Sequence, residues 1–511
     1  MTSAFDWILL GVPSVPALAA LLAWRANPPA AGRLITAASW LTLVLALSCA
    51  LHFFSGGPAG AEPASSRLPS AALRLDALGA VMAVPVAFLG AVILGFARRY
   101  LAGDPGQARF LAWMSLTLAA VLTLVLSGHL LLLLAAWIAT SLSLHRLLLF
   151  YPTRAGAQFS ARKKFVFSRL GDLCLLGAAL GLHAHHGTFA IAPILAAVSA
   201  GHTEGATTAA LLLALCAMLK SAQFPFHSWL PDTMETPTPV SAFMHAGIIN
   251  AGGFLVIRLA PIFAAAPVAA NLLAIVGAFT AAFGAIVMLA QPSVKRALAY
   301  STIAQMGFML LECGLGAYGL ALIHLAAHSL YKAHAFLTAG STIGAGSRAA
   351  VPLRTPALML GVLTGALVVM LVSTILHVVA PASELHPGVF TVVLALALAY
   401  GMARTWSVAG GWRTVTKAAL AAMGVAVITL GLHLGATQFP GPLPQPRPPQ
   451  ALLIFVGGIF AGLFLFQALL WRANRSALGR RLYVHALNGF YVGTWLNRLL
   501  GRLWPQQPVS A

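Results

Sequence analysis

Charge is scarce in this sequence. Only 8% of its 511 residues are Asp, Glu, Lys or Arg, whereas 60% are hydrophobic, and the mean hydropathy is +0.89. A soluble fold of this length needs more charge to stay in solution, so lipid is the natural solvent for the chain. A spanning helix needs about 20 apolar residues, and only helices or closed barrels satisfy their backbone groups in lipid. The repeated apolar runs therefore predict an all-α polytopic membrane protein.

Acidic residues are scarcer still, with 10 Asp and Glu against 30 Lys and Arg and a net charge of +20. In a soluble protein this excess would indicate nucleic-acid binding, but here the cations sort into loops on alternate sides of the apolar runs. One side carries Arg25, Arg33, Arg98, Arg99, Arg109, Arg154, Arg162, Lys163, Lys164, Lys295, Arg296, Arg348, Arg354, Arg404, Arg413 and Lys417, and the tail adds Arg472, Arg475, Arg480 and Arg481. The opposite loops hold little beyond Arg67, Arg74, Arg258 and Arg447. This bias predicts a multi-pass membrane protein with its N-terminus outside and its C-terminus in the cytoplasm, and it argues against nucleic acid as a partner. We expect the bacterial inner membrane as its location.

Cysteine is rare as well. Its four positions lie in or near apolar runs without C-x-x-C spacing, at Cys49, Cys174, Cys216 and Cys313. We interpret them as small packing residues. Three histidines cluster at His183, His185 and His186 in a predicted outer loop; we favour a polar, solvated loop end, and a metal site is the alternative. Because haem, iron–sulfur and P-loop motifs are also missing, we expect no cofactor and no catalytic chemistry in this chain.

About 15 apolar runs reach the length that a bilayer core requires. They lie near residues 5–24, 34–54, 77–97, 110–127, 129–150, 165–183, 206–230, 239–258, 268–290, 298–315, 317–343, 356–379, 389–408, 415–433 and 451–471. Loops rich in Pro, Gly or charge separate them, as at 57–70 and 435–450. No connection is long enough for a soluble domain, so we expect one membrane domain over residues 1–471 and a basic cytoplasmic tail over residues 472–511.

Few ionisable side chains fall inside these runs. Each is a candidate functional residue, because a charge in lipid costs several kcal/mol. Lys220 lies in an otherwise uncharged stretch. His324, His328 and Lys332 follow at i, i+4 and i+8, which places them on one helix face about one turn apart. The row suits a proton relay; alternatively, the histidines are buried hydrogen-bonding residues that fix helix packing.

The run that contains Lys220 is interrupted soon after the lysine. Four prolines, which cannot continue an ordinary helix, follow at Pro225, Pro231, Pro237 and Pro239. Broken helices at membrane depth commonly mark ion paths, because the freed backbone lines a polar cavity. A desolvated lysine beside such a break gives up its proton more readily, so Lys220 is a candidate switchable carrier. His245 lies on the next run, and Asp232 and Glu235 are interpreted as polar caps in the loop.

Several long motifs follow one another along the chain. They are L-R-L-D-A-L at 73–78, S-R-L-G-D at 168–172, K-S-A-Q-F-P-F-H-S-W-L-P-D-T-M-E-T-P-T-P-V-S-A-F-M-H-A-G-I-I-N-A-G-G at 220–253, V-K-R-A-L-A-Y-S-T-I-A-Q-M-G at 294–307, H-L-A-A-H-S-L-Y-K-A-H-A-F-L at 324–337 and N-G-F-Y at 488–491. They resemble the proton-conducting membrane transporter family, which includes NuoL-type subunits of complex I, Mrp-type cation/proton antiporter subunits and the DabB subunit of an inorganic-carbon transporter. The resemblance covers about residues 70–345 and the N-G-F-Y segment.

The resemblance implies an antiporter-like subunit fold with inverted repeats and two broken helices. Lys220 resembles the central lysine on the broken seventh helix of the family. His324, His328 and Lys332 resemble the relay on the second broken helix, and His245 resembles the histidine that bridges the two groups. These residues are therefore expected to form the proton or cation pathway.

Two departures from the family pattern alter this expectation. Arg169 and Asp172 match the pair at the inlet half of the channel, but the family's Trp-Glu pair, whose glutamate partners the central lysine, is Trp-Ile at 137–138. The charge that is usual on the twelfth helix is missing too, because 355–376 is uncharged. Our hypothesis is that Asp172 supplies the counter-charge for Lys220 in place of the glutamate.

Both departures, and a tail without the long lateral helix and final span of NuoL, fit DabB better than a complex I pump. DabB resemblance implies a hetero-complex with a large cytoplasmic DabA-like protein, similar to a zinc β-carbonic anhydrase, which would hold the zinc. Influx of protons or Na⁺ through this chain would drive hydration of CO2 to bicarbonate. The alternatives are a proton-pumping NuoL-like subunit of a NADH-quinone oxidoreductase or hydrogenase, an Mrp-type Na⁺/H⁺ antiporter subunit, and a non-conducting anchor. The choice between H⁺ and Na⁺ and the role of Glu312 stay open.

Overall fold

The structure is a computed structural model that describes residues 4–56, 72–342, 353, 355–379, 388–409, 411–438, 444, 446–473 and 476–503. These residues are predominantly helical, and their β pairing is confined to two isolated bridges, Leu73 with Ser127 and His129 with Ala190. The predicted all-α class is therefore confirmed. The predicted loop at 57–70 lies outside the described residues, as do Arg348, Arg354 and Arg475.

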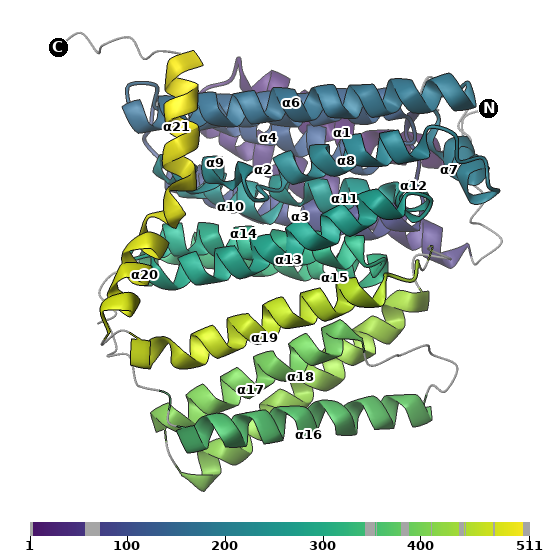
Figure 1. Ribbon diagram of the computed structural model, residues 1–511. Coiled ribbons are helices and arrows are strands. Elements are labelled where there is room, and N and C mark those ends of the chain that lie inside the picture. Colours follow the sequence, from purple (N-terminus) through teal and green to yellow (C-terminus); the bar gives the residue numbers. More distant parts are fainter. Residues whose placement is uncertain are drawn as a thin grey trace.

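The first fifteen α-helices form the larger part of the molecule (Figure 1). They are α1 (Ala4–Ala23), α2 (Pro28–Ser55), α3 (Ala77–Tyr100), α4 (Gln107–Val125), α5 (Leu130–Leu148), α6 (Ala155–His186), α7 (Ile191–Ser199), α8 (Ala206–Lys220), α9 (Trp229–Asp232), α10 (Thr238–Ala246), α11 (Ala251–Arg258), α12 (Ala260–Ala264), α13 (Pro267–Ala290), α14 (Val294–Gly314) and α15 (Tyr318–Leu337). Four further helices lie beside this part: α16 (Thr355–Val379), α17 (Val389–Ala409), α18 (Trp412–Gln438) and α19 (Gln450–Ala473).

The predicted membrane runs coincide with these helices. Twelve described helices are long and apolar enough to cross a membrane, with α10 and α11 counted as one broken span. The three other runs fall on α8, α14 and α15. α8 has 15 residues before its break, and α14 and α15 contain the lysines and histidines of the motifs noted above. α8 is therefore apolar but too short, whereas α14 and α15 are long enough but less apolar because of these charged and polar residues.

Two breaks interrupt the spans near the centre of the larger part. α8 ends at Lys220, and short helical turns follow: η3 (Phe226–Ser228), α9 and η4 (Thr233–Glu235). Ala222 in this segment has φ +49°, a left-handed conformation that costs a residue with a Cβ about 1–2 kcal/mol. The second break separates α10 from α11 at Gly247 and η5 (Ile248–Asn250).

Prolines help to set the ends of the short turns, as the sequence predicted. Pro225 precedes η3, and Pro237 immediately precedes α10. Pro239 is the second residue of α10 and Pro231 lies in the single turn of α9, positions where a missing N–H removes no internal helical bond. The chain therefore reverses through the break without leaving a long helix with an interior proline.

Close packing elsewhere depends on glycine. A Cβ added at Gly277 or Gly307 would come within 2.6 Å of the facing backbone, and one at Gly314 within 2.4 Å. These glycines let the backbones of α13 and α14 approach each other closely. α14 also packs against α15.

α6 is the longest described helix, with 32 residues, and it corrects two predictions. Its length of about 48 Å exceeds a hydrocarbon core of about 30 Å, so the helix continues well beyond the apolar run. Lys163 and Lys164, which we placed in a loop, lie inside it and are 1% and 3% exposed. His183, His185 and His186, also placed in a loop, lie in its last turn.

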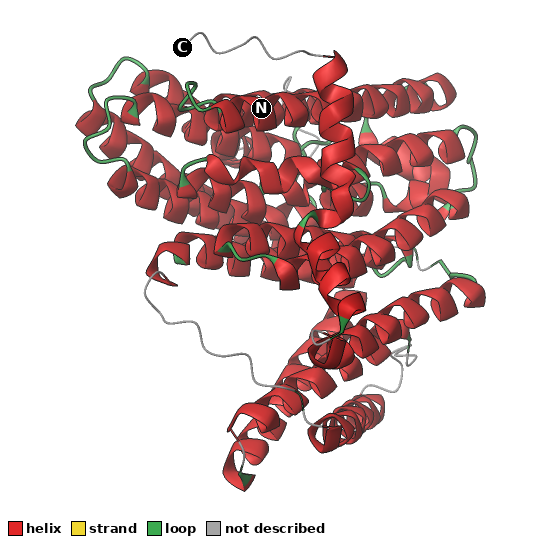
Figure 2. Ribbon diagram, turned by 60° about the vertical axis from the view of Figure 1, so that its left-hand side comes forward, coloured by secondary structure: helices red, strands yellow, loops and turns green. Residues whose placement is uncertain are grey.

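The chain ends in two helices that run in another direction. α20 (Ala477–Leu487) and α21 (Val492–Leu503), joined by η7 (Gly489–Tyr491), lie across the ends of the spans at the left of Figure 1. Figure 2, in which that side comes forward, shows α21 in front of the larger part. The N-terminal ends of α4, α6 and α14 and the C-terminal end of α3 carry the arginines and lysines of the positive side, and α21 lies at this same end of the bundle.

Candidate ion-conduction site

Lys220 is buried against an aromatic ring instead of an acid. It is the last residue of α8 and is 8% exposed. Its Nζ lies 4.4 Å from the centroid of the Trp137 ring on α5 and has no hydrogen-bond partner among the described residues. A desolvated cation–π contact stabilises the charge by about 2 kcal/mol. The tryptophan of the altered Trp-Ile pair thus partly replaces the missing carboxylate.

A polar cluster on α6 lies next to this lysine. Asp172, 7% exposed, forms an ion pair with Arg169, whose Nη2 is 2.7 Å from Oδ2. Lys164 donates from Nζ to the carbonyl oxygen of Ser141 at 2.6 Å and to its Oγ at 2.9 Å, and Arg169 donates to the same Oγ at 3.3 Å. α6 and α8 are in contact at this place, because a Cβ at Gly171 would lie 3.8 Å from the Cβ of Leu219, although Asp172 and Lys220 do not meet within the 4.0 Å of an ion pair in the described structure. The structure therefore brings the predicted Arg169, Asp172 and Lys220 together.

Lys164 is a member of this cluster that we missed on sequence. Its position among loop cations concealed it, yet Lys164 and Asp172 are eight residues apart, the spacing that places two residues on one helix face. The same spacing relates His324 to Lys332. With Lys164 included, three cations surround one acid, so the cluster holds an excess of positive charge in a buried place.

His245 lies at the second break, on the side of the histidine row. It is fully buried at the end of α10. Its Nδ1 is 3.0 Å from the Oγ1 of Thr302 on α14, and its ring stacks on Phe336 of α15 at 4.3 Å between centroids. The charge of Lys332 acts on this imidazole, while its Nε2 has no hydrogen-bond partner among the described residues. His245 therefore contacts the α15 side of the predicted pathway directly.

Side-chain hydrogen bonds connect the two breaks. Ser221, next to Lys220, donates from Oγ to the carbonyl oxygen of Ile249 at 2.8 Å. Asn250 donates from Nδ2 to the Oγ of Ser329 on α15 at 2.7 Å and to the carbonyl oxygen of Ala246 at 3.0 Å. These bonds place polar atoms between the Lys220 side and the α15 row. Sequence reasoning missed Ser221, Asn250 and Ser329, since neutral polar residues carry no charge signal.

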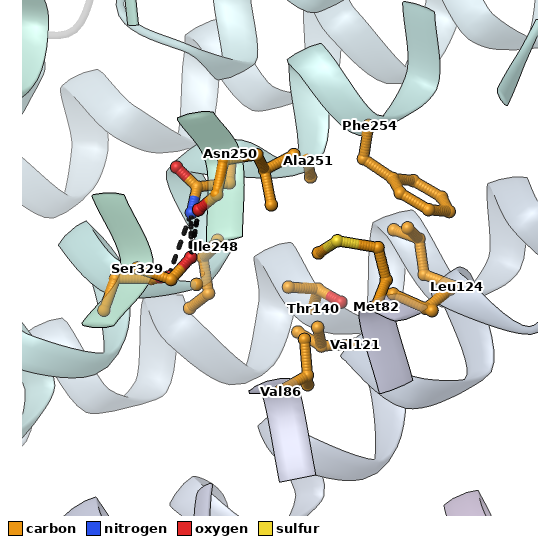
Figure 3. A pocket seen from close by; sticks show the side chains of 14 residues that line it. Met82, Val86, Val121, Leu124, Thr140, Ile248, Asn250, Ala251, Phe254 and Ser329 are labelled. Atoms are coloured by element: carbon orange, nitrogen blue, oxygen red, sulfur yellow. Dashed lines mark hydrogen bonds between the residues drawn. The ribbon is translucent and has the colours of Figure 1, made fainter. Parts of the chain in front are cut away.

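A small cavity lies beside the Asn250–Ser329 bond (Figure 3). Its volume is about 30 Å³, and Met82, Thr140 and Phe254 are among its lining residues. A buried water needs about 10–15 Å³ of such space and two to four polar partners. The cavity therefore has room for about two waters but offers mostly apolar walls, and it is too small for a continuous water chain.

The predicted row on α15 is present. Lys332 is fully buried, and its Nζ donates to the carbonyl oxygen of Leu298 at 3.3 Å. His328 is 4% exposed and neither ring nitrogen has a hydrogen-bond partner among the described residues; its ring lies 6.2 Å from that of His324. The three side chains share one face of a continuous helix, so the second break lies in the span of His245 and not in the span of the row, where we had placed it.

Glu312 acquires a partner at the far end of the row. It is 2% exposed on α14, and its Oε2 lies 2.8 Å from the Nδ1 of His324. The Nε2 of His324 is 2.9 Å from the Oε1 of Gln305. The acid is thus not a solvated helix end, and it gives the row a carboxylate at the end opposite to Lys332.

The two acids of the first break do not act as caps. Asp232 accepts a hydrogen bond from Lys163 at 2.9 Å. Arg154 donates to the carbonyl oxygen of Glu235 at 3.1 Å, and the Glu235 carboxylate lies so close to Gly156 that a Cβ there would come within 2.3 Å of it. Both acids therefore tie the broken segment to α6, an outcome that our interpretation as loop caps did not anticipate.

The histidines at the end of α6 do not gather around a metal site. The rings of His183 and Phe189 stack at 4.0 Å between centroids. Among the described residues, no group of three or more His, Cys, Asp and Glu side chains could hold a metal ion.

The predicted pathway residues all lie in the first part of the chain. Beyond residue 342, the described residues bury the side chain of Ser407 and the Oγ of Ser373 but no charged side chain. This agrees with the uncharged stretch that forms α16, where the family usually has a lysine or aspartate.

Two family models match the chain. Residues 127–416 match the model described as NADH:quinone oxidoreductase/Mrp antiporter, TM, and residues 67–111 match the one described as NADH-Ubiquinone oxidoreductase (complex I), chain 5 N-terminus. Among curated relatives, the probable inorganic carbon transporter subunit DabB2 of Halothiobacillus neapolitanus is 40% identical over 88% of this chain and 83% of its own length. The probable inorganic carbon transporter subunit DabB of Hydrogenovibrio crunogenus is 38% identical over 83% and 82%. NAD(P)H-quinone oxidoreductase chain 5 of Synechocystis sp. is 41% identical, over 53% of this chain and 40% of its own length.

Solved structures show the same fold. A chain of the Mrp complex from Dietzia sp. DQ12-45-1b matches with a TM-score of 0.64 and 23% identity, over 99% of this chain and 61% of that one. A chain of the archaeal membrane-bound sulfane sulfur reductase matches with a TM-score of 0.59 and 18% identity, over 96% and 99%. The chain therefore belongs to the NADH:quinone oxidoreductase/Mrp antiporter family of multi-pass, ion-conducting membrane subunits and is similar to DabB proteins over most of its length.

Proposed function

We propose that this chain conducts protons or Na⁺ across the bacterial inner membrane as the membrane subunit of an inorganic-carbon uptake complex. Its N-terminus would lie outside and its C-terminus in the cytoplasm, as the positive-inside bias predicts. The ion would pass the Lys220 cluster, the second break beside His245 and the α15 row that ends at Lys332. The soluble partner would be a large DabA-like zinc protein that hydrates CO2 to bicarbonate.

The observation that carries the conduction proposal is the environment of the two lysines. Lys220 rests on a tryptophan ring and Lys332 on a backbone carbonyl, and neither forms an ion pair with a described acid. A lysine without a fixed counter-ion in a dry place can exist in its neutral as well as its charged form, which a carrier requires.

The polar atoms between the lysines support a stepwise path. Ser221, Asn250 and Ser329 can each donate and accept a hydrogen bond, and the cavity beside them has space for about two waters. In the described conformation this cavity, at about 30 Å³, is too small for a continuous water chain, so conduction requires a small opening at the breaks. The geometry favours an opening in which the 2.7 Å hydrogen bond between Asn250 and Ser329 breaks and the cavity beside it widens.

The carbon-uptake part of the proposal rests on the relatives. The two probable inorganic carbon transporter subunits, from Halothiobacillus neapolitanus and Hydrogenovibrio crunogenus, match most of this chain and most of their own length. A cation that moves down about 100 mV releases about 2.3 kcal/mol, which is enough to bias CO2 hydration against its reversal. We assign the zinc to the partner. Catalytic zinc needs three closely placed protein ligands, and the described residues of this chain contain no group of three such ligands.

A redox-driven proton pump is the second candidate function. It is favoured by the 41% identity to NAD(P)H-quinone oxidoreductase chain 5, although this chain spans only 40% of that protein. Against it stand the Trp-Ile pair at 137–138 and the uncharged α16, since the pump mechanism that the family resemblance implies uses a lysine–glutamate pair at the first place and a charge at the second.

Affinity purification from native membranes in mild detergent, with mass spectrometry and metal analysis, tests the proposal. We expect one large soluble subunit with stoichiometric zinc, and CO2 hydration that stops when an ionophore collapses the ion gradient in vesicles. Iron–sulfur or quinone-reducing subunits, or a set of small Mrp-type membrane proteins, would instead assign the chain to a respiratory or antiporter complex.

A further inference from the structure

A buried lysine connects the first broken segment to the C-terminal helix. The side chain of Lys163 on α6 is 0% exposed. Its Nζ donates to the Oδ2 of Asp232 in α9 at 2.9 Å and to the Oδ1 of Asn497 in α21 at 2.7 Å. These partners are 69 and 334 positions away in the sequence, so one ammonium group joins three separate parts of the fold.

Further contacts fix the C-terminal segment on the bundle. A Cβ at Gly493 would lie 3.2 Å from the Cβ of Ser228, so α21 packs directly on the broken segment. Leu496 is 6% exposed. Gln291 donates from Nε2 to the carbonyl oxygen of Leu487 at 3.2 Å. Gly489, with φ +58°, allows the turn into α21 to pass close to the hydroxyl of Tyr300.

The opposite face of α21 is exposed and both apolar and basic. Trp495 is 64% and Leu499 43% exposed, and Arg498 and Arg502 are exposed beside them. The four residues stand at i, i+3, i+4 and i+7, the spacing of one helix face, and we call them the docking face. Residues 472–511 contain six arginines and no Asp or Glu.

The position of α21 favours a protein partner over lipid as the occupant of the docking face. α21 lies across the ends of the spans (Figures 1 and 2), and its inner side contacts α6 and η3. Its outer side therefore points away from the bundle end, along the membrane normal, whereas lipid surrounds the sides of the spans. An exposed tryptophan beside two arginines is the composition that interface hot spots favour.

We infer that the docking face binds an acidic surface of the soluble partner, and that Lys163 is the positioning residue that links this contact to the broken segment behind Lys220. The identity of the partner rests on the function proposed above. Movement of α21 acts on Asp232 through one shared ammonium group. It also acts on α6 next to Lys164, which holds Ser141 in the Lys220 cluster.

Photo-crosslinking tests the docking face. A photoreactive residue replaces Leu499 in the full chain, with a matched control at Met359 on α16, which is 64% exposed. After irradiation of native membranes and purification, we expect position 499 to crosslink to an acidic peptide of the co-purifying soluble zinc subunit, and position 359 to crosslink to lipid. If the zinc subunit co-purifies but position 499 reacts with lipid or with nothing, the docking face is wrong and the proposed function stands. If no soluble zinc subunit co-purifies, both are wrong.

Three further variants test the charges of the docking face and the link through Lys163. Arg498→Glu with Arg502→Glu should lower the affinity for the purified partner about tenfold or more, with a weaker salt dependence, because rim charges set steering and register. Asn497→Ala keeps the docking face but removes the acceptor for Lys163. We expect it to keep partner affinity and to lose several-fold in coupled ion flux, whereas Asn497→Asp, which retains an acceptor, restores the flux. Unchanged flux in Asn497→Ala, or equal loss in both Asn497 variants, would overturn the link.

Discussion

Lys332→Met should stabilise the protein while it abolishes transport. The side chain is fully buried, its ammonium group donates a hydrogen bond to the carbonyl oxygen of Leu298 at 3.3 Å, and no described acid pairs with it. Methionine has nearly the same length and volume but no charge. A charge at the bilayer centre costs about 2.5–3.5 kcal/mol on the insertion scale, and apolar replacement of poorly compensated buried charges stabilises proteins by about 1–4 kcal/mol.

We therefore expect Lys332→Met to raise the free energy of unfolding by about 1–3 kcal/mol. Lys163→Met is the matched control, because the same substitution there removes a lysine that does have partners. It leaves Asp232 and Asn497 without their donor, so stability should fall by about 1–3 kcal/mol. The thermal unfolding midpoints of the wild-type, Lys332→Met and Lys163→Met complexes, each purified in detergent, give their order of stability. Ion flux into proteoliposomes measures transport.

The expected order of midpoints is Lys332→Met, wild type, Lys163→Met. If Lys332→Met lowered the midpoint and kept wild-type flux, Lys332 would be a structural residue and the reasoning from its burial would be refuted. A lowered midpoint with lost flux would contradict the claim that the lysine is kept at a cost in stability.

Three other predictions concern the counter-charges of the pathway. Asp172→Asn should strongly reduce transport and Asp172→Glu should retain most of it, because the acid is the one described carboxylate whose charge acts on Lys220; unchanged flux in Asp172→Asn would reject its role. Trp137→Leu removes a cation–π contact of about 2 kcal/mol and should lower flux about 30-fold, with partial recovery in Trp137→Phe; equal fluxes in leucine and phenylalanine variants would show that the ring does not act on the lysine. Glu312→Gln should slow transport without loss of assembly, since it removes the acid that pairs with His324, and a flux assay on variant vesicles of matched protein content measures it.

The spans and the row could be predicted because both depend on local pattern. Apolar length specifies a membrane helix whatever its neighbours are, and the i, i+4, i+8 spacing of His324, His328 and Lys332 places them on one face of any helix. The first break could be predicted for the same reason, since Pro225 to Pro239 act on their own backbone.

The partners of the buried charges could not be predicted, because they come from distant parts of the chain. Lys163 and Lys164 are neighbours in sequence, yet one binds α9 and α21 while the other binds α5. Both were mistaken for loop cations since α6 extends beyond its apolar run. The Glu312–His324 pair, only 12 positions apart across one turn, was within reach of sequence reasoning.

The missing glutamate was identified from the sequence, but what stands in its place was not. We expected Asp172 alone to compensate Lys220, and in the structure Asp172 pairs with Arg169 while Trp137 covers the lysine. An aromatic ring that replaces a carboxylate does not change the count of charged residues. Its effect on the lysine depends on the position of the Lys220 ammonium group over the Trp137 ring, which only the structure gives.

Ion flux through the purified native complex, reconstituted in vesicles under an imposed membrane potential, tests the central claim most directly. Dyes that report H⁺ and Na⁺ identify the ion, and Lys220→Ala and Lys332→Ala are compared with wild type at equal insertion. The account predicts that each variant assembles but that its flux falls to the leak of protein-free vesicles, because both lysines lie on one path. Wild-type flux in both variants would contradict it.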